Sequence, residues 1–298
     1  MVRNVKVGIA SLTLFHFIFI VFCILCVIPI IAILSISLSD KIDIVNFGYR
    51  LIPRRFSTEA YIYIFRYPKE VIASYGVSVL ITALGGIIGL FLTALYAYPL
   101  SRPDFKYRNI FAFYIFFTMI FNGGLVPTYI VVARMLHLSD TIWALIMPYV
   151  ANAFFVIVMR TYFQTIPISL VESAKIDGSS EFRTFFTIIL PLSKPALATI
   201  GLFIVLNYWN DWYLALLYVS PSAKNLVPLQ YMLYKIMANI QYLTQQMQNA
   251  FVNVDMTKLP SESARMAMCI VAAGPMLFIF PFFQKYFVKG LTVGAIKG

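Results

Sequence analysis

The sequence predicts an all-α, polytopic membrane protein with six transmembrane helices and one polar helix–Gly–helix loop between the fourth and fifth of them. Three observations predict this fold. Of 298 residues, 61% are hydrophobic and 12% charged, and the mean hydropathy is +0.83, which leaves too few polar residues to cover a soluble domain. Uncharged apolar runs recur along the chain, each long enough to cross a hydrocarbon core of about 30 Å. Finally, six charged residues fall within the segment 172–194, while the apolar runs on either side carry almost none.

The first two spans are separated by a polar segment. Lys6 and Asp40 enclose 33 uncharged residues, a run too long for a secretory signal, so we expect an uncleaved helix. Residues 40–70 hold six Lys/Arg and the sequence AYIYIFRY, which predicts an external loop with a helix in the membrane interface. Glu70 and Arg102 enclose the second span of 31 uncharged residues. Gly85, Gly86 and Gly89 in this span predict close contact with another helix.

Four further spans follow, at residues 109–133, 141–159, 195–223 and 266–284. The fifth span carries a single charge, Asp211. The positive-inside rule orients these spans only weakly. With the N-terminus inside, internal segments hold 12 Lys/Arg and external segments hold 11.

Two short helices are predicted in the polar loop after the fourth span. Ser169 with Glu172 three residues later is typical of a capping box, so we expect the first helix to begin there. Gly178 follows where a left-handed C-terminal cap would end that helix. Ser179 or Ser180 can cap a second helix that runs to about residue 187.

The sequence contains no catalytic or metal-binding pattern. His16 and His137 lie far apart, and the three cysteines fall within apolar runs. No G-x-x-x-x-G-K-[ST] motif is present, so this chain cannot hold ATP phosphates in a P-loop, and ATP and magnesium would belong to a partner. The net charge of +11 is spread between the spans. Lipid head groups explain it better than nucleic acid does.

Polar residues at mid-membrane depth are the candidate transport path. Asn122, Asn152 and Asn207 lie 12 to 14 residues past the last charge before each span, which is near half depth at about 1.5 Å per residue. An amide in hydrocarbon is costly, so each should face the protein interior or a wet cavity. Hydrogen bonds between helices are the competing explanation.

The fifth span has the richest polar face. By helical spacing, Asn207, Asn210 and Asp211 share one side, and Trp209 lies among them. Amides, a carboxylate and aromatic planes suit sugars, whose rings offer apolar C–H faces and hydroxyl edges. Helix–helix hydrogen bonding and an interfacial aromatic belt remain the alternative.

The polar loop resembles the coupling loop of ABC-importer permeases, whose pattern is E-A-A, three residues, G, nine residues, I-x-L-P. Here the pattern is E-S-A at 172–174, Gly178 and I-I-L-P at 188–191, with Ser173 in place of the middle Ala. The resemblance implies that the loop at 169–191 docks on a partner ATPase. The residues implied in that contact are Glu172, Ser173, Ala174, Asp177 and Gly178. Glu172 can equally serve its own helix cap.

The likeness extends over residues 70–298, through FNGGLVPTYIVVARM, NYWNDWYLALLYVS and the tail KGLTVGAIKG. These segments are similar to the carbohydrate-uptake (maltose-type) permeases, nearest the oligosaccharide and aldouronate subgroup. The resemblance implies one permease domain over 1–298, with its core at about 70–290, in the bacterial cytoplasmic membrane and with both termini cytoplasmic. It also implies a second, different permease subunit, two cytosolic ATPases and an extracytoplasmic solute-binding protein.

Alternative functions remain open at this point. The same architecture can carry a non-sugar solute, such as an amino acid or a peptide. An ion-coupled secondary transporter would be expected to show charged relays and half-span repeats, and the sequence shows one intramembrane Asp and no repeat. A membrane enzyme has little support, because carboxylates and histidines are not clustered.

Overall fold

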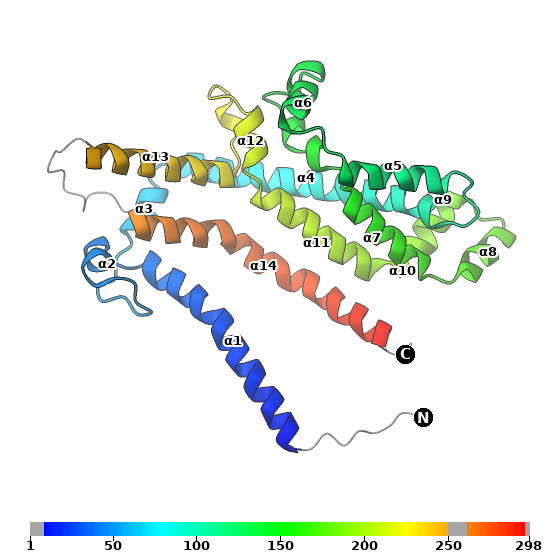
Figure 1. Cartoon of the computed structure of the whole chain (residues 1–298), viewed down its shortest axis with the longest axis horizontal. Coiled ribbons are helices and arrows are strands. Elements are labelled where there is room, and N and C mark those ends of the chain that lie inside the picture. The colour runs from blue at the N-terminus through cyan, green and yellow to red at the C-terminus, as the bar shows by residue number, and fades with distance from the viewer. Residues whose placement is uncertain (1–8, 250–260, 296–298) are drawn as a thin grey trace. The chain divides into compact units, whose positions relative to one another are not determined.

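The computed structural model describes residues 9–249 and 261–295, and within these ranges it is helical, with no strand beyond an isolated bridge. Figure 1 shows the succession of helices along the chain. The chain divides into two compact units. One contains residues up to 68 together with 235–274, and the other contains 69–234 together with the segment from 275 onward.

The first unit is built on the helix α1 (Ile9–Ser37). Its side chains from 12 to 31 are exposed around the whole circumference, and a helix that is apolar on every side is typical of a membrane span. Two short helices follow, α2 (Lys41–Phe47) and α3 (Glu59–Ile64). Exposed apolar side chains such as Val45 stand on α2, as a helix in the membrane interface requires, and that placement stays a prediction.

The second unit contains the longest described run of helices. Its α4 (Pro68–Ser101) and α11 (Lys194–Asn210) lie in direct contact. A Cβ atom added at Gly85 would lie 2.5 Å from the ring of Tyr208, and one at Gly86 would lie 3.3 Å from Val205. The predicted close contact at these glycines is therefore confirmed. The Tyr208 hydroxyl also donates a 2.8 Å hydrogen bond to the Ile146 carbonyl.

The remaining elements of this unit are short, and most end at a bend. They are α5 (Arg108–Ile120), α6 (Leu125–Tyr129), η1 (Ile130–Met135), η2 (Ile142–Leu145), η3 (Met147–Tyr149), α7 (Ala153–Gln164), α8 (Ile168–Ile176), α9 (Glu181–Thr184), η4 (Phe185–Ile189), α10 (Leu190–Leu192), α12 (Tyr213–Tyr218) and η5 (Lys224–Leu226). Two helices continue across both units, α13 (Leu229–Asn249) and α14 (Ser261–Ala295).

Three described helices are long and apolar enough to cross a membrane, and they lie in α1, α4 and α14. Three pairs of shorter elements pass the same test together but are bent: α5 with α6–η1 by 114°, η2–η3 with α7 by 52°, and α9–α10 with α11 by 82°. The described chain therefore offers up to six spans if each bent pair is one crossing.

Candidate functional site

The polar loop folds as a helical hairpin, but its first helix does not begin as predicted. Helix α8 begins at Ile168 with Pro167 at the N-cap, and no side chain caps it. The capping box expected from Ser169 and Glu172 is therefore wrong. Pro167 supplies the boundary, because a proline fixes its own φ and removes an N–H donor, and Ser169 falls within the first turn.

The turn at Gly178 is confirmed in full. Gly178 has φ +77°, a left-handed conformation that favours glycine. Its N–H donates to the Lys175 carbonyl at 3.0 Å, and the Ser179 N–H donates to the Ala174 carbonyl at 2.8 Å. These two bonds form a Schellman motif, which satisfies the last carbonyls of α8 without using a side chain.

The second arm of the hairpin begins at the predicted cap and continues further than expected. Ser180 Oγ accepts a hydrogen bond from the Arg183 N–H at 3.3 Å and so caps α9. The arm then continues through η4 and α10 as far as Leu192. The chain bends by 82° between this arm and α11, with Ser193 between the two elements.

The hairpin presents one exposed face. Glu172, Ser173 and Asp177 are exposed, and the side chain of Ile176 between them is 86% exposed. Ala174 is buried in this chain, and its place in the ATPase contact stays a prediction. It lies three residues after the buried Val171, on the inward side of α8.

The hairpin is tied to the end of α4 and to the loop that follows it. Lys175 Nζ lies 2.7 Å from Asp104 Oδ2 and 2.7 Å from Glu181 Oε1. The Tyr98 hydroxyl donates to Glu181 Oε2 at 2.7 Å, and the Arg102 guanidinium lies 4.8 Å from the centre of the Tyr98 ring. The hydrogen bond to Asp104 raises the pKa of Lys175, and the same bond lowers the pKa of Asp104.

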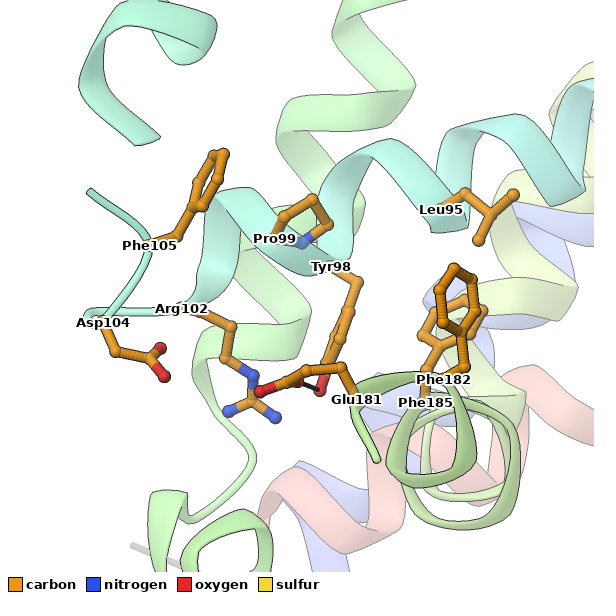
Figure 2. Close-up of a pocket in the computed structure, with 9 residues that line it drawn as sticks. All are labelled: Leu95, Tyr98, Pro99, Arg102, Asp104, Phe105, Glu181, Phe182 and Phe185. Atoms are coloured by element: carbon orange, nitrogen blue, oxygen red, sulfur yellow. Dashed lines mark hydrogen bonds between the residues drawn. The ribbon is translucent and has the colours of Figure 1, made fainter. Parts of the chain in front are cut away.

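A pocket of about 370 Å³ opens beside these contacts, as Figure 2 shows. Its wall is mostly apolar, with the charged side chains gathered on one side. The lining residues are Leu95, Tyr98, Pro99, Arg102, Asp104, Phe105, Glu181, Phe182 and Phe185.

Two of the predicted mid-membrane amides lie at helix breaks. Asn122 stands between α5 and α6 and accepts the Gly124 N–H at 2.9 Å. Asn152 is the N-cap of α7 and accepts the Phe154 and Phe155 N–H groups at 3.0 and 3.3 Å. Both side chains are exposed in this chain. Backbone that is not helical at membrane depth needs such acceptors, and it is tolerated only inside protein or beside water.

Asn152 also lines a second pocket, of about 430 Å³, between α4, α5 and α7. Its polar walls include the hydroxyl-bearing side chains of Tyr96, Tyr114 and Thr118. A cavity with these groups can hold water or a polar solute.

The fifth span departs from its predicted face. Asn207 and Asn210 are exposed on α11, and the Asn210 amide donates to the Leu206 carbonyl of its own helix at 2.9 Å. Trp209 is 2% exposed and its ring centre lies 6.3 Å from that of Tyr75. The ring therefore lies inside the chain in this conformation, and the role of Trp209 in the path stays a prediction.

Asp211 does not continue the face of the two amides, which is a further correction. Helix α11 ends at Asn210, and Asp211 has extended backbone angles. Its half-buried carboxylate accepts the Tyr149 hydroxyl at 3.2 Å and the Leu214 N–H at 3.1 Å. The helical spacing that placed Asp211 beside Asn207 does not apply beyond the end of the helix.

Sequence reasoning missed the contact residues Tyr149, Tyr98 and Asp104. Each meets its partner across 62 or more residues of chain, and no local pattern marks such a pairing. In the sequence, Lys175 is one of several charged residues in the polar loop after the fourth span, and nothing in the pattern distinguishes it. The position of Tyr98 and Asp104 near the end of the second span was the one available signal.

Comparison with known proteins decides the family. Residues 85–293 match the model for the binding-protein-dependent transport system inner membrane component. The chain belongs to this family. It is 42% identical to the polygalacturonan/rhamnogalacturonan transport system permease protein YtcP of Bacillus subtilis (strain 168), over 86% of this chain and 87% of that protein. It is 39% identical to protein LplC of the same organism, over 98% of this chain and 92% of that protein.

A solved structure agrees with this assignment. A bacterial ABC transporter involved in the import of the acidic polysaccharide alginate contains a chain that matches with a TM-score of 0.75 and 28% identity. The match covers 92% of this permease and 95% of that chain. The permease is therefore a membrane transport subunit of an ABC importer rather than an enzyme, and its family implies ATPase and solute-binding partners.

Proposed function

We propose that this permease moves an acidic, uronate-containing oligosaccharide into the cytoplasm. The observation that carries this proposal is that two separate relatives are named for acidic polysaccharides, polygalacturonan/rhamnogalacturonan at 42% identity and alginate at a TM-score of 0.75. The excess of 11 positive charges suits an anionic solute, although lipid contact alone would also account for it.

The proposed path runs through the second unit. It uses the exposed amides Asn122, Asn152, Asn207 and Asn210, and it passes the pocket beside Asn152. Support comes from the helix breaks at Asn122 and Asn152, because breaks inside spans supply the backbone groups and the water access that a polar solute needs. Asp211 would shape this path by holding the end of α11 rather than by touching the solute.

In the proposed topology the six spans are α1, α4, α5 with α6–η1, η2–η3 with α7, α11 and α14, and both termini are cytoplasmic. Residues 1–8 and 296–298 lie outside the described residues, so support for this topology comes from the spans alone. The hairpin then lies in the cytosol and docks on a partner ATPase through Glu172, Ser173 and Asp177, with Gly178 shaping the turn. A second, different permease subunit completes the pore. ATP and magnesium are held by the two ATPases.

Reconstituted transport tests the substrate. The complete transporter, with its ATPases and solute-binding protein, is placed in sealed vesicles with internal ATP and offered either oligogalacturonate or the neutral galactose oligomer of equal length. We expect ATP-dependent uptake of the acidic oligomer and little of the neutral one. Equal uptake of both would remove the acidic specificity, and uptake of neither sugar alongside an amino acid or peptide would remove the sugar assignment.

A further inference from the structure

The contacts around Lys175 join three separate segments at one point. The ammonium group reaches Asp104 in the loop after α4 and Glu181 at the start of α9, each at 2.7 Å, while Lys175 itself belongs to α8. Glu181 is held on its other oxygen by the hydroxyl of Tyr98 in α4, also at 2.7 Å. Both arms of the hairpin are thus connected to the end of α4, as Figure 2 shows for Tyr98 and Glu181.

Aromatic packing reinforces the same junction. Phe185, which is 1% exposed, lies with its ring centre 5.1 Å from that of Tyr98. About two turns earlier in α4, the ring of Phe91 stacks on that of Phe186, with the ring centres 6.3 Å apart. The second arm of the hairpin therefore packs along α4, although in sequence it leads to α11.

The connection to α11 has a different character. The chain bends by 82° between α10 and α11, and Pro195 stands in the first turn after the bend. The element before the bend, α10, has only three residues, so the hairpin is not continuous with the long helix α11. The hairpin is thus firmly attached to α4 and joined to α11 through a bend.

We propose that Lys175, Asp104, Glu181 and Tyr98 form a latch that makes the hairpin and the end of α4 move as one body. Displacement of the hairpin by the ATPase is then passed directly into the second span, and not only along the chain into α11. This inference rests on the proposed docking of the hairpin on the ATPase. It assigns these four side chains a positioning role.

The latch contributes to geometry more than to stability. The side chains of Lys175, Glu181 and Asp104 are 40%, 51% and 59% exposed, and exposed ion pairs add little to folding. The role of the latch is instead to keep the hairpin and the end of α4 together when the ATPase displaces the hairpin. Removal of the latch should therefore leave assembly intact and reduce the solute moved per ATP.

The test uses the complete reconstituted transporter. Lys175→Met keeps the length of the side chain and removes its charge, and Lys175→Arg retains the charge and both possible pairings. Lys106→Met is the matched control, because Lys106 is exposed in the loop after α4 and makes no ion pair within the described part of the chain. ATP hydrolysis, solute uptake and co-purification of the ATPase are measured for each.

We expect Lys175→Met to bind the ATPase normally, to hydrolyse ATP, and to move about five-fold less solute per ATP. Lys175→Arg should recover most of this loss, and Lys106→Met should behave as the unaltered protein. Tyr98→Phe, which removes only the hydroxyl donated to Glu181, should show a smaller loss.

Two results would overturn the latch: an unchanged ratio of uptake to ATP in Lys175→Met, or loss of ATPase binding in that variant, since the latter would make Lys175 a docking residue. Failure of the unaltered permease to bind an ATPase would instead refute the proposed function itself, so the two failures are distinguishable.

Discussion

Two helix ends of this permease are followed by acidic residues, and these residues have different surroundings. At the end of α8 the backbone caps itself through the Schellman motif at Gly178. After the end of α11 the carboxylate of Asp211 accepts the Tyr149 hydroxyl and the Leu214 N–H, which lies in the first turn of α12. The acids of α8 consequently remain exposed, whereas the acid of α11 is occupied and half-buried.

This difference separates residues that are free to meet a partner from residues that hold the fold. Glu172 and Asp177 make no ion pair within the described residues, and both face outward. Asp211 has two partners inside its own chain. Substitutions at the first end should therefore impair coupling, and substitutions at the second should reduce stability.

The largest effect is expected at Gly178. A valine there has ample space, since nothing lies within 4 Å of the added Cβ, but it cannot readily adopt φ +77°. The cost is about 1–2 kcal/mol, enough to remodel an exposed turn. We expect Gly178→Val to insert in the membrane and lose most ATP-coupled transport. Gly178→Asn is the matched control, because asparagine tolerates this conformation. Full transport by Gly178→Val would show that the shape of the turn is unimportant.

At Asp211 the loss should appear as instability. Asp211→Ala leaves the Tyr149 hydroxyl and the Leu214 N–H without their acceptor, which costs about 1–3 kcal/mol. Asp211→Asn keeps an accepting oxygen and should cost less. The melting temperature of the purified complex measures both. If the melting temperature is unchanged while sugar preference shifts, Asp211 contacts the solute and the contrast with α8 disappears.

Glu172→Gln should show the reverse pattern with a smaller effect. An exposed substitution of this kind changes folding stability by no more than about 0.5 kcal/mol. We expect an unchanged melting temperature together with weaker ATPase binding in a pull-down from mixed purified subunits. A Glu172→Gln variant that binds the ATPase normally would reduce Glu172 to a surface residue of α8.

The smallest effect is expected from pH. The pKa of Lys175 is raised above 10.5. The stabilisation from its charge is therefore fully present below pH 10.5 and is lost only as the pH rises through the raised pKa of the folded state. The pKa of Asp104 is lowered below 3.8. The stabilisation from its carboxylate is therefore fully present above pH 3.8 and is lost only as the pH falls through the lowered pKa of the folded state. Arg102, Glu181 and Tyr98 face the same site.

The advantage of the unaltered permease over Lys175→Met, in solute moved per ATP, should therefore stay constant from about pH 6 to about pH 9. Parallel uptake and hydrolysis measurements across this range check the expectation. A change in that advantage with a midpoint near neutrality would mean that another titrating group controls the junction.

The sequence alone was enough wherever the cause was local or compositional. Hydropathy predicted the apolar helices, and the glycines of the second span predicted its contact with another helix. The spacing around Gly178 predicted a left-handed turn, since few residues other than glycine adopt that conformation. The family followed from the same spacing together with the similar segments along residues 70–298.

Only the tertiary structure decided which way the important side chains face and what they meet. Ala174 and Trp209 turned inward, and Asp211 left the helical face assigned to it, because its helix ends one residue earlier. The link between Lys175 and Asp104 spans 71 residues of chain. Helical periodicity holds only within one uninterrupted helix, and contacts between distant segments depend on how the helices pack. The sequence by itself therefore determined the helical, membrane-protein class and the turn, while packing decided the partners of each charge.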